Sequence, residues 1–324
     1  MIEFLTEYGL FLAKLATIVV ALLVIVGFAV ASTKRGSQRE GLEIENLNRR
    51  FEKLGDAIRR SVQGKTRFKR TSKERRKADK QRDKEGSGRK RVFVLDFKGD
   101  LRASATASLR EEISAILSVA TSDDQVLVRL ENPGGAVHEH GLAASQLARI
   151  RKHGVHLIVA VDKVAASGGY LMACVADRIL AAPFAIVGSI GVIAQLPNFH
   201  RFLEDKGVDF EQVTAGKYKR TLTLFGKNTD EGREKIKEEL EDVHDLFKAQ
   251  IAEHRPQLDI DAVATGEHWY GLRALSLNLV DEIGTSDDYL IEAAVDHDLY
   301  SVVYRRRRSL PERVMGGVDS LLSR

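Results

Sequence analysis

Residues 126–135 read VLVRLENPGG, and residues 157–170 read LIVAVDKVAASGGY. Each stretch starts with a short apolar run, rich in β-branched residues, and ends in a turn that contains two adjacent glycines. Short apolar runs bounded by turn residues are typical of strands that are buried on both faces. Residues 92–97, which read VFVLDF, show the same pattern and predict a third buried strand.

Helical segments separate and follow these strands. Apolar residues recur at helical spacing in residues 109–117, and residues 138–152 and 230–254 are further expected helices. Alternating strands and helices predict βαβ units and a mostly parallel sheet, so we expect an α/β domain over residues 92–304. Ligands of such sheets bind at the carboxyl ends of the strands, which is where both glycine turns lie.

The composition narrows the class of protein. The chain has 324 residues, of which 44% are hydrophobic and 30% are charged. These values exclude a disordered chain, a collagen-like chain and a multi-span membrane protein. Cys174 is the only cysteine, which excludes a disulfide scaffold and a zinc or redox site of the Cys-x-x-Cys type. The sequence has no metal or nucleotide motif, so we expect neither a metal nor another cofactor.

A long apolar stretch near the N-terminus predicts a membrane anchor. Residues 10–31 read LFLAKLATIVVALLVIVGFAVA and carry one charge, Lys14. About 20 apolar residues suffice for a helix to cross the hydrocarbon core of a bilayer. The alternative is a cleaved signal peptide, which requires a positive segment before the apolar stretch, whereas Glu3 and Glu7 precede this one. We therefore expect residues 1–33 to form an uncleaved transmembrane anchor.

The next segment, residues 34–91, is a basic stalk that concentrates the positive charge of the chain. It holds 22 Lys and Arg against 9 Asp and Glu, whereas the net charge of the whole chain is only +4. Apolar residues at helical spacing predict an amphipathic or coiled helix over residues 41–60, and residues 64–90 read as a solvated linker. Basic segments beside a membrane helix bind anionic lipid head groups. A nucleic-acid site is the weaker interpretation, because aromatic residues do not alternate with the basic ones.

Charge also indicates the side of the membrane. Lys34, Arg35 and Arg39 directly follow the apolar stretch, which by the positive-inside rule places the domain in the cytoplasm. We therefore expect a single-pass membrane protein. The charge pattern favours a cytoplasmic domain, but long domains can cross the membrane against this rule, so a domain on the outer face stays open. The C-terminal residues 305–324 form a basic, amphipathic tail that could pack on a neighbour or lie at a membrane surface.

The two glycine turns carry the candidate chemistry. Backbone N–H groups of paired glycines can approach a ligand closely and hold a developing oxyanion. Ser167 stands where a strand meets a helix, an arrangement that can expose a nucleophilic hydroxyl. The Gly-x-Ser-x-Gly motif of hydrolases is not matched, because Ala165 replaces its first glycine. Taken singly, either glycine motif could equally serve only to reverse the chain, without a catalytic role.

A nucleophilic serine needs a base. The chain has nine histidines, and His138, His140, His153 and His244 lie in polar contexts where a solvated side chain is the default expectation. Lys219 is the other candidate, because a desolvated lysine can lose its proton near neutral pH and then act as a general base.

Five motifs, in this order, resemble the signal peptide peptidase A (protease IV) family. They are Asn132-Pro133-Gly134-Gly135, Ala166-Ser167-Gly168-Gly169-Tyr170, Val187-Gly188-Ser189-Ile190-Gly191-Val192, Gly216-Lys217-Tyr218-Lys219 and Leu279-Val280-Asp281-Glu282-Ile283-Gly284-Thr285. The anchor, the charged stalk and the single catalytic unit make the chain most similar to the SohB-type inner-membrane peptidases of Gram-negative bacteria.

The resemblance implies a ClpP/crotonase-type fold of stacked βαβ units and a Ser–Lys catalytic dyad. Ser167 would be the nucleophile and Lys219 the general base. Ser189 would orient the lysine, and the backbone amides of Gly135 and Gly168 would form the oxyanion hole. Each such amide could stabilise the transition state by about 3 kcal/mol.

The resemblance also implies substrates and assembly. The expected substrates are membrane-associated peptides, such as released signal peptides, or damaged membrane proteins. Related enzymes form rings in which the serine and the lysine sometimes come from different subunits, so we expect a homo-oligomer. Six apolar residues near the turns could line an apolar groove for the substrate, although we expect most of them in the core: Leu171, Met172, Ile186, Val187, Ile190 and Val192.

Three alternatives differ in chemistry. A crotonase-like acyl-CoA enzyme could use the glycine amides on a thioester without Ser167 or Lys219. A non-catalytic membrane scaffold would be expected to have lost one of these two residues, and both are present. A Ser-His-Asp peptidase on the same fold would need a catalytic histidine. This sequence offers no histidine in the helix that matches the one expected to carry it in that family.

Overall fold

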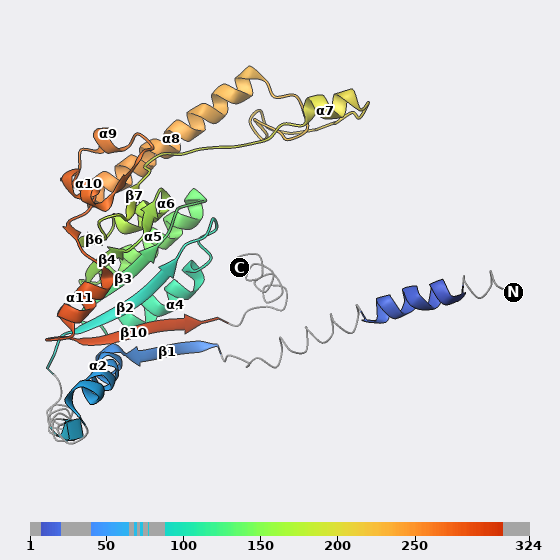
Figure 1. Ribbon diagram of the computed structural model, residues 1–324. Coiled ribbons are helices and arrows are strands. Elements are labelled where there is room, and N and C mark those ends of the chain that lie inside the picture. The colour runs from blue at the N-terminus through green and yellow to red at the C-terminus, as the bar shows by residue number, and fades with distance from the viewer. Residues whose placement is uncertain are drawn as a thin grey trace. The chain divides into compact units, whose positions relative to one another are not determined.

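The structure is a computed structural model that describes residues 8–20, 40–64, 68–69, 72–73, 77 and 88–306. It divides into two units, and the larger, residues 43–303, contains most of the strands and helices that Figure 1 labels. In the other unit, residues 8–20 form a helix, while the remainder of the expected anchor and the tail from residue 307 onward lie outside the described residues. No helix among the described residues is long and apolar enough to cross a membrane.

Seven strands form the main sheet, in the order β1-β10-β2-β3-β4-β6-β9. Their bounds are β1 (Gly41–Asn46), β2 (Arg91–Lys98), β3 (Gln125–Glu131), β4 (His156–Val161), β6 (Arg178–Ala181), β9 (Glu282–Ile283) and β10 (Asp298–Arg305). Every pair from β10 to β9 is parallel, which confirms the predicted α/β fold with a mostly parallel sheet.

A smaller sheet carries the candidate site. It consists of β5 (Val164–Ala166), β7 (Ile186–Gly188) and β8 (His268–Tyr270), with β5 parallel and β8 antiparallel to β7. The helices are α2 (Leu47–Gln63), α4 (Thr106–Leu117), α5 (Val137–Lys152), α6 (Gly168–Ala173), α7 (His200–Asp205), α8 (Asp230–His254), α9 (Ile260–Val263), α10 (Gly271–Ser276) and α11 (Ser286–Ala293). The expected helix over residues 230–254 has these bounds in the structure.

The main sheet is buried on both faces, as its apolar runs predicted. Successive side chains of a strand point to opposite faces, so β2 contributes to two separate clusters of the core. Phe93, Leu95 and Phe97 join the larger cluster with α4, α5 and α6, whereas Val92 and Val94 join the smaller one with α2 and α11. The helices therefore sandwich the sheet and fix the position of its strand ends.

The expected helix over residues 41–60 is only partly correct. Residues 41–46 form β1, and the helix α2 begins at Leu47, where the side chain of Asn46 accepts a hydrogen bond from the backbone N–H of Arg49. The alternation of Leu42 and Ile44 with glutamates is a strand pattern, which the helical spacing of the later apolar residues obscured. Leu47 is buried in the smaller cluster, so this segment packs on the domain.

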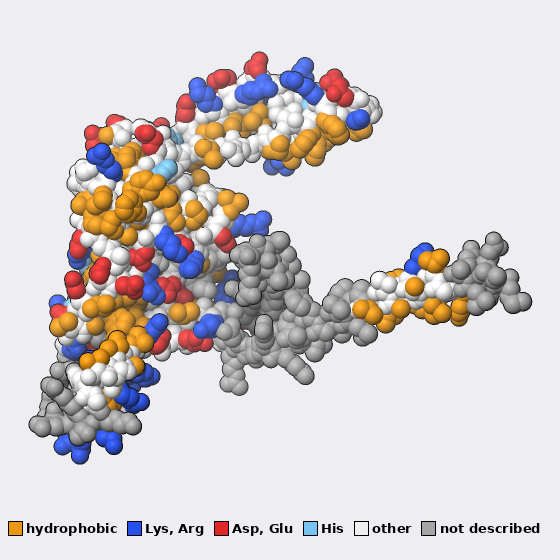
Figure 2. Space-filling model, viewed as in Figure 1, with side chains coloured by type: hydrophobic (Ala, Val, Ile, Leu, Met, Phe, Trp, Pro, Cys, Tyr) orange, Lys and Arg blue, Asp and Glu red, His pale blue; other side chains and the backbone are white. Residues whose placement is uncertain are grey.

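A long connecting segment separates β7 from α8. We call residues 192–229 of this segment the arm. It contains α7 but no strand, and every residue from 204 to 220 is exposed. Figure 1 shows α7 at the end of α8 that is far from the sheets, with the connecting chain running alongside α8. Hydrophobic side chains gather along one side of the arm (Figure 2).

Candidate active site

Ser167 occupies a sharp turn between β5 and α6. Its backbone is in the left-handed region, with φ of 52° and ψ of −120°, which an L side chain rarely adopts. The backbone N–H of Ser167 donates to the carbonyl oxygen of Gly188 at 2.7 Å and so holds the turn against β7. Unfavourable backbone conformations of this kind persist where the surrounding structure imposes them, and they are common at active sites.

The Pro-Gly-Gly turn after β3 packs directly against the serine turn. The backbone of Asn132 bonds to both ends of β5: its carbonyl oxygen accepts the N–H of Ala166, and its N–H donates to the carbonyl oxygen of Val164. Gly134 has φ of 95°, and a Cβ atom added there would lie 2.7 Å from the carbonyl oxygen of Ala166 and 2.8 Å from Cβ of Ser167. Only glycine fits at this approach, so the turn is built to touch the serine.

Both glycines predicted to bind an oxyanion lie beside Ser167. Gly135 and Gly168 line the same cavity as the serine. Gly168 is the first residue of α6, where a backbone N–H has no acceptor within the helix and can serve a ligand. The structure thus brings together the predicted nucleophile and the two predicted oxyanion donors.

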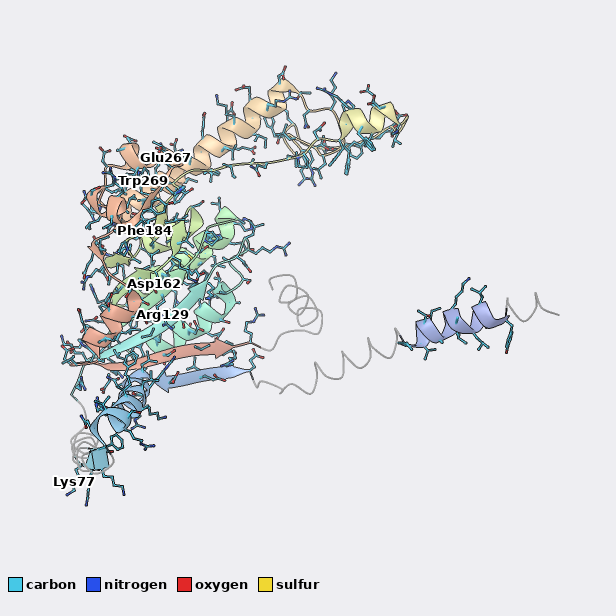
Figure 3. All side chains as sticks on the ribbon, viewed as in Figure 1. Lys77, Arg129, Asp162, Phe184, Glu267 and Trp269 are labelled. Carbon is cyan, nitrogen blue, oxygen red and sulfur yellow. The ribbon has the colours of Figure 1, made fainter. Side chains whose placement is uncertain are left out.

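Ser189 lies on the neighbouring strand, just past the end of β7. Ala166 pairs with Gly188 in parallel register, so Ser167 and Ser189 follow the paired residues at the same edge of the small sheet. The backbone N–H of Ser189 donates to the carbonyl oxygen of Glu267 at 2.7 Å, and its hydroxyl donates to the carbonyl oxygen of Gly266 at 3.4 Å. Figure 3 labels Glu267 and the adjacent Trp269, whose ring lies against Gly188.

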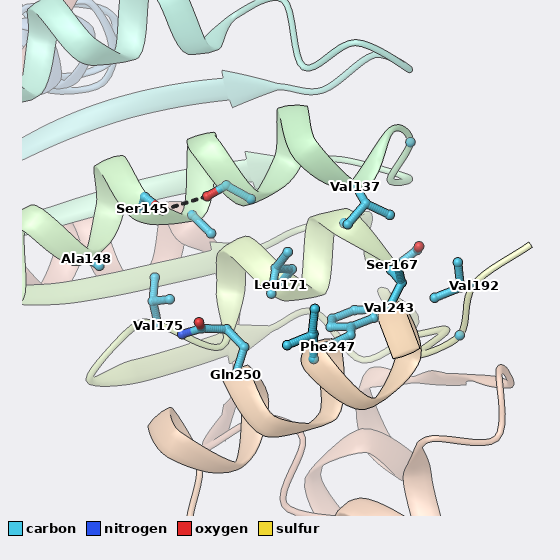
Figure 4. A pocket seen from close by; sticks show the side chains of 16 residues that line it. Val137, Ser145, Ala148, Ser167, Leu171, Val175, Val192, Val243, Phe247 and Gln250 are labelled. Carbon is cyan, nitrogen blue, oxygen red and sulfur yellow. Dashed lines mark hydrogen bonds between the residues drawn. The ribbon is translucent and has the colours of Figure 1, made fainter. Parts of the chain in front are cut away.

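An apolar cavity of about 370 Å³ opens beside Ser167. It lies between α5, α6 and α8, and Figure 4 shows the side chains of Val137, Leu171 and Phe247 around it. Leu171 and Val192 line this cavity, whereas Met172, Val187 and Ile190 are fully buried core residues. Gln250 and Ser145 supply polar groups in an otherwise largely apolar wall. The cavity suits an apolar side chain placed next to the serine hydroxyl.

Lys219 lies elsewhere, in the exposed part of the arm. Its backbone N–H donates to the carbonyl oxygen of Gly216 at 3.2 Å and closes a turn. No hydrogen bond or ion pair within the described part of the chain joins its side chain to Ser167 or Ser189. Nearby Lys217 pairs with Glu231 at 2.8 Å, and that hydrogen bond raises the pKa of Lys217. The structure therefore assembles the serine, the glycines and Ser189 without the lysine.

His140 corrects a prediction made from the sequence. A solvated side chain was the default expectation, but its exposed fraction is 0% and its ring contacts Asn132 and Gly168. The spacing of the buried face of α5 carries this signal, because His140 stands three, four and seven residues before Ala143, Ala144 and Leu147. The residues directly beside the histidine in the sequence are not apolar, and this hid the periodicity.

The part of α8 that walls the cavity was also missed. The sequence predicted a long charged helix there, but Val243, Phe247 and Gln250 line the cavity from its later turns. Their spacing of four and three residues puts them on one face of the helix. That spacing is visible in the sequence, but no pattern in the sequence around α8 indicates that this face packs over α6.

Comparison with known proteins shows the family of the chain. The family model described as "Peptidase family S49 N-terminal" matches residues 3–147, and the model "Peptidase family S49" matches residues 149–300. The chain is 48% identical over 321 residues to the "Probable protease SohB" of Haemophilus influenzae, covering 95% of this chain and 91% of that protein. The chain belongs to peptidase family S49.

Other similarities are more distant. The "Putative signal peptide peptidase SppA" of Enterococcus faecium is 30% identical over 219 residues, which cover 64% of this chain and 63% of that protein. Among solved structures, a mutant of the 1510-N membrane-bound stomatin-specific protease, in complex with a substrate peptide, is 11% identical with a TM-score of 0.46. That comparison covers 72% of this chain and 99% of the solved chain.

Proposed function

We propose that this member of peptidase family S49 is a serine endopeptidase in which Ser167 and Lys219 form a catalytic dyad. The observation that carries the proposal is the placement of Ser167 on a left-handed turn, at an apolar cavity that Gly135 and Gly168 also line. We further propose that the stacked βαβ units and the second, smaller sheet form the ClpP/crotonase-type fold.

The proposed reaction uses Ser167, Lys219 and the two glycine amides. Lys219 Nζ, in its neutral form, takes the proton of the Ser167 hydroxyl while Oγ attacks the carbonyl carbon of the scissile peptide bond. The negative charge on the former carbonyl oxygen is stabilised by the N–H groups of Gly135 and Gly168. The amine leaves with the proton held by the lysine, and an ester to Ser167 remains. Water then gives a proton to the lysine and attacks the carbonyl carbon of the ester. The bond to Oγ of Ser167 breaks, the lysine returns the proton to Oγ, and the peptide acid, the serine hydroxyl and the neutral lysine result.

We propose that the lysine of the dyad comes from a second copy of the chain. The arm that carries Lys219 is exposed over residues 204–220 and presents large apolar side chains, including Phe202 and Val213, which is 97% exposed. Phe199 and Phe210 pack on Phe225 with ring centroids 6.2 and 5.8 Å apart, which gives the arm a small apolar centre of its own. An exposed apolar surface of this kind is typical of a contact between subunits.

Substitution of the dyad tests the reaction. Ser167→Ala and Lys219→Arg should each abolish hydrolysis of defined peptides, because arginine cannot lose its proton. Ser114→Ala, at an exposed serine on α4, and Lys217→Arg, in the same turn as Lys219, are the matched controls and should leave activity unchanged. Hydrolysis that survives in Ser167→Ala would contradict the proposal and favour a reaction that needs only the glycine amides.

Mixing tests the origin of the lysine. Inactive Ser167→Ala and inactive Lys219→Arg subunits, assembled together, should regain activity, because some sites then combine an intact serine with an intact lysine from another copy. Each variant assembled alone should stay inactive. If both residues must come from one chain, the mixture will be as inactive as its components.

The proposed substrates are membrane-associated peptides, such as released signal peptides, or damaged membrane proteins. The apolar wall of the cavity supports this choice, because Val137, Leu171 and Phe247 would accept an apolar side chain of the peptide. Peptides that differ only in one apolar residue, changed to aspartate, test it. The aspartate peptide should be cleaved far more slowly by the wild-type chain.

We also propose that residues 10–31 anchor the chain in the bacterial inner membrane, with the domain in the cytoplasm and the basic stalk on anionic lipid head groups. The charge pattern around the apolar stretch supports this topology. An alkaline phosphatase fused to the C-terminus should be inactive, because that enzyme needs the oxidising side of the membrane. An active fusion would place the domain on the outer face.

A further inference from the structure

His140 lies at the centre of the two turns that form the candidate site. It stands in the first turns of α5, and its side chain is entirely buried. Its ring nitrogens lie 3.0 Å from the carbonyl oxygen of Ala136 and 3.2 Å from the side-chain oxygen of Asn132. A buried polar side chain is costly unless its hydrogen bonds are made, so the placement of this ring needs an explanation beyond filling space.

The contact with Asn132 leads to the Pro-Gly-Gly turn. The oxygen Oδ1 of Asn132 accepts the backbone N–H of Gly134 at 2.9 Å, and the amide Nδ2 donates to the sulfur of Met172 at 3.2 Å. These two bonds fix which end of the amide faces His140. Because Oδ1 can only accept, a bond from the ring to Asn132 requires the proton on Nε2 of His140. In a neutral ring Nδ1 then has no proton to donate to the carbonyl oxygen of Ala136, which already accepts the backbone N–H of His140 at 3.1 Å. The ring and the Gly134 amide thus share one oxygen, which holds the turn that continues into Gly135.

The other contact leads to the serine turn. A Cβ atom added to Gly168 would lie 2.4 Å from Cγ of His140, so the backbone of Gly168 rests directly on the imidazole. Gly168 follows Ser167, and its N–H is one of the two proposed oxyanion donors. A single buried ring therefore contacts both parts of the proposed oxyanion hole. It supports the backbone of Gly168, and it bonds the Asn132 side chain that orients the turn leading to Gly135.

We propose that His140 is a positioning residue for the oxyanion hole, which aligns the N–H groups of Gly135 and Gly168 through its bond to Asn132 and its contact with Gly168. The inference rests on the proposed function, because it concerns the same site. His140 neither reaches the cavity nor touches the reacting atoms, and it acts only through its two neighbours. Its effect should therefore be on the chemical step and not on the binding of substrate.

The test compares variants of the full chain in peptide hydrolysis. His140→Phe keeps a flat ring against Gly168 but loses the bond to Asn132, and we expect kcat to fall about tenfold or more while KM stays within about twofold. His140→Gln restores a side-chain N–H that can reach Asn132 and should recover part of kcat. His153→Phe, the same exchange at an exposed position at the end of α5, should match the wild type.

The outcomes separate the inference from the proposed function. If Ser167→Ala is inactive while His140→Phe keeps the wild-type kcat, the positioning role of His140 is wrong and the serine mechanism stands. Activity that survives in Ser167→Ala overturns the proposed function itself. Equal losses of kcat in His140→Phe and His140→Gln would also overturn the inference, because a ring that only fills space has no use for the N–H.

One measurement needs no stable variant of the histidine. In the wild-type chain labelled with ¹⁵N at its histidines, the shift of the buried ring reports whether Nε2 carries a proton. A proton on Nε2 is expected, because the bond to Asn132 Oδ1 depends on it. An unprotonated Nε2 in the active enzyme would overturn the inference even if His140→Phe failed to fold.

Discussion

Ser167 and Lys219 lie in turns of very different construction. Ser167 adopts a left-handed conformation that is imposed by the buried residues on both sides of it and by the bond to Gly188. Lys219 lies in a fully exposed stretch, where one backbone bond to Gly216 closes the turn. The fold of one chain thus orders the proposed nucleophile. The free energy needed to order the proposed base must come from another contact, which is why we assign that role to a second subunit.

Hydrogen exchange should show the largest contrast between the two turns. Amides from β5 to α6 lie in the core and should exchange at least about 1,000-fold more slowly than those of residues 204–220, which are all exposed. The measurement is made on the solubilised chain, diluted until it is monomeric. Assembly at higher concentration should then slow exchange in the arm and leave the serine turn unchanged. An arm that is equally protected at all concentrations would contradict the contrast.

Two glycines with positive φ provide a matched pair of substitutions. Gly134 (φ 95°) faces backbone and Ser167 at under 3 Å, whereas at Gly216 (φ 98°) an added Cβ would meet only Cβ of Lys219, at 3.9 Å. Gly134→Ala should lower kcat/KM at least about 100-fold and the melting temperature by several degrees, because the serine turn must move. Gly216→Ala strains its own turn by about 1 kcal/mol and should leave the melting temperature of the domain unchanged. Equal effects on melting would show that the arm is as tightly packed as the core.

The same contrast explains what the sequence predicted well. The strands of the main sheet and the helices that cover it could be predicted from apolar periodicity. Both faces of the sheet are buried, so successive apolar side chains of β2 pack into two separate clusters of the core. The strand pattern predicted that both glycine turns, and Ser167 in one of them, lie at the carboxyl ends of strands, whereas Ser189 was expected at the site only from the family resemblance.

The sequence was less informative where contacts are distant along the chain. His140 was expected in solvent, because its polar neighbours suggested a surface helix, and only the packing of α5 on α6 buries it. β1 was expected to be helical, because six residues of alternating pattern are too few to outweigh the longer helical pattern that follows them. Lys219 was expected near Ser167 only from the family resemblance, because no local pattern links its turn to the serine turn.

The ion pairs at the two ends of α8 differ in burial. Arg255, which directly follows α8, is 2% exposed and bonds both carboxylate oxygens of Asp281 at 2.8 Å, whereas Lys217 pairs with Glu231 near the start of α8 with both side chains exposed. Arg255→Leu leaves the Asp281 carboxylate without its partner and should lower the free energy of unfolding by about 3–5 kcal/mol. Lys217→Leu should cause no measurable change, because water already screens that pair. Urea unfolding of both variants measures the difference, and similar losses would show that the start of α8 is buried in the monomer.

Acid should weaken the core through Asp124, which lies just before β3 and is 3% exposed. Desolvation alone would raise the pKa of Asp124, but hydrogen bonds from Arg91 and Thr121 outweigh it and lower the pKa to about 2. In the unfolded chain the pKa is about 3.9, so the ionised carboxylate stabilises the fold above pH 4 by about 2 kcal/mol. That contribution disappears as the pH falls from about 4 through 2, because the proton then binds the folded state as well.

Asp124→Asn removes the group that titrates. The difference in free energy of unfolding between wild type and Asp124→Asn should therefore shrink by about 2 kcal/mol between pH 5 and pH 2. Asp245→Asn is the comparison on α8, where a hydrogen bond from Lys248 also lowers the pKa of the carboxyl, but at a position fully open to water. Its difference from wild type should change far less with pH, because solvent and salt screen the pair. If both differences shrink equally, burial of Asp124 is not what makes its charge matter.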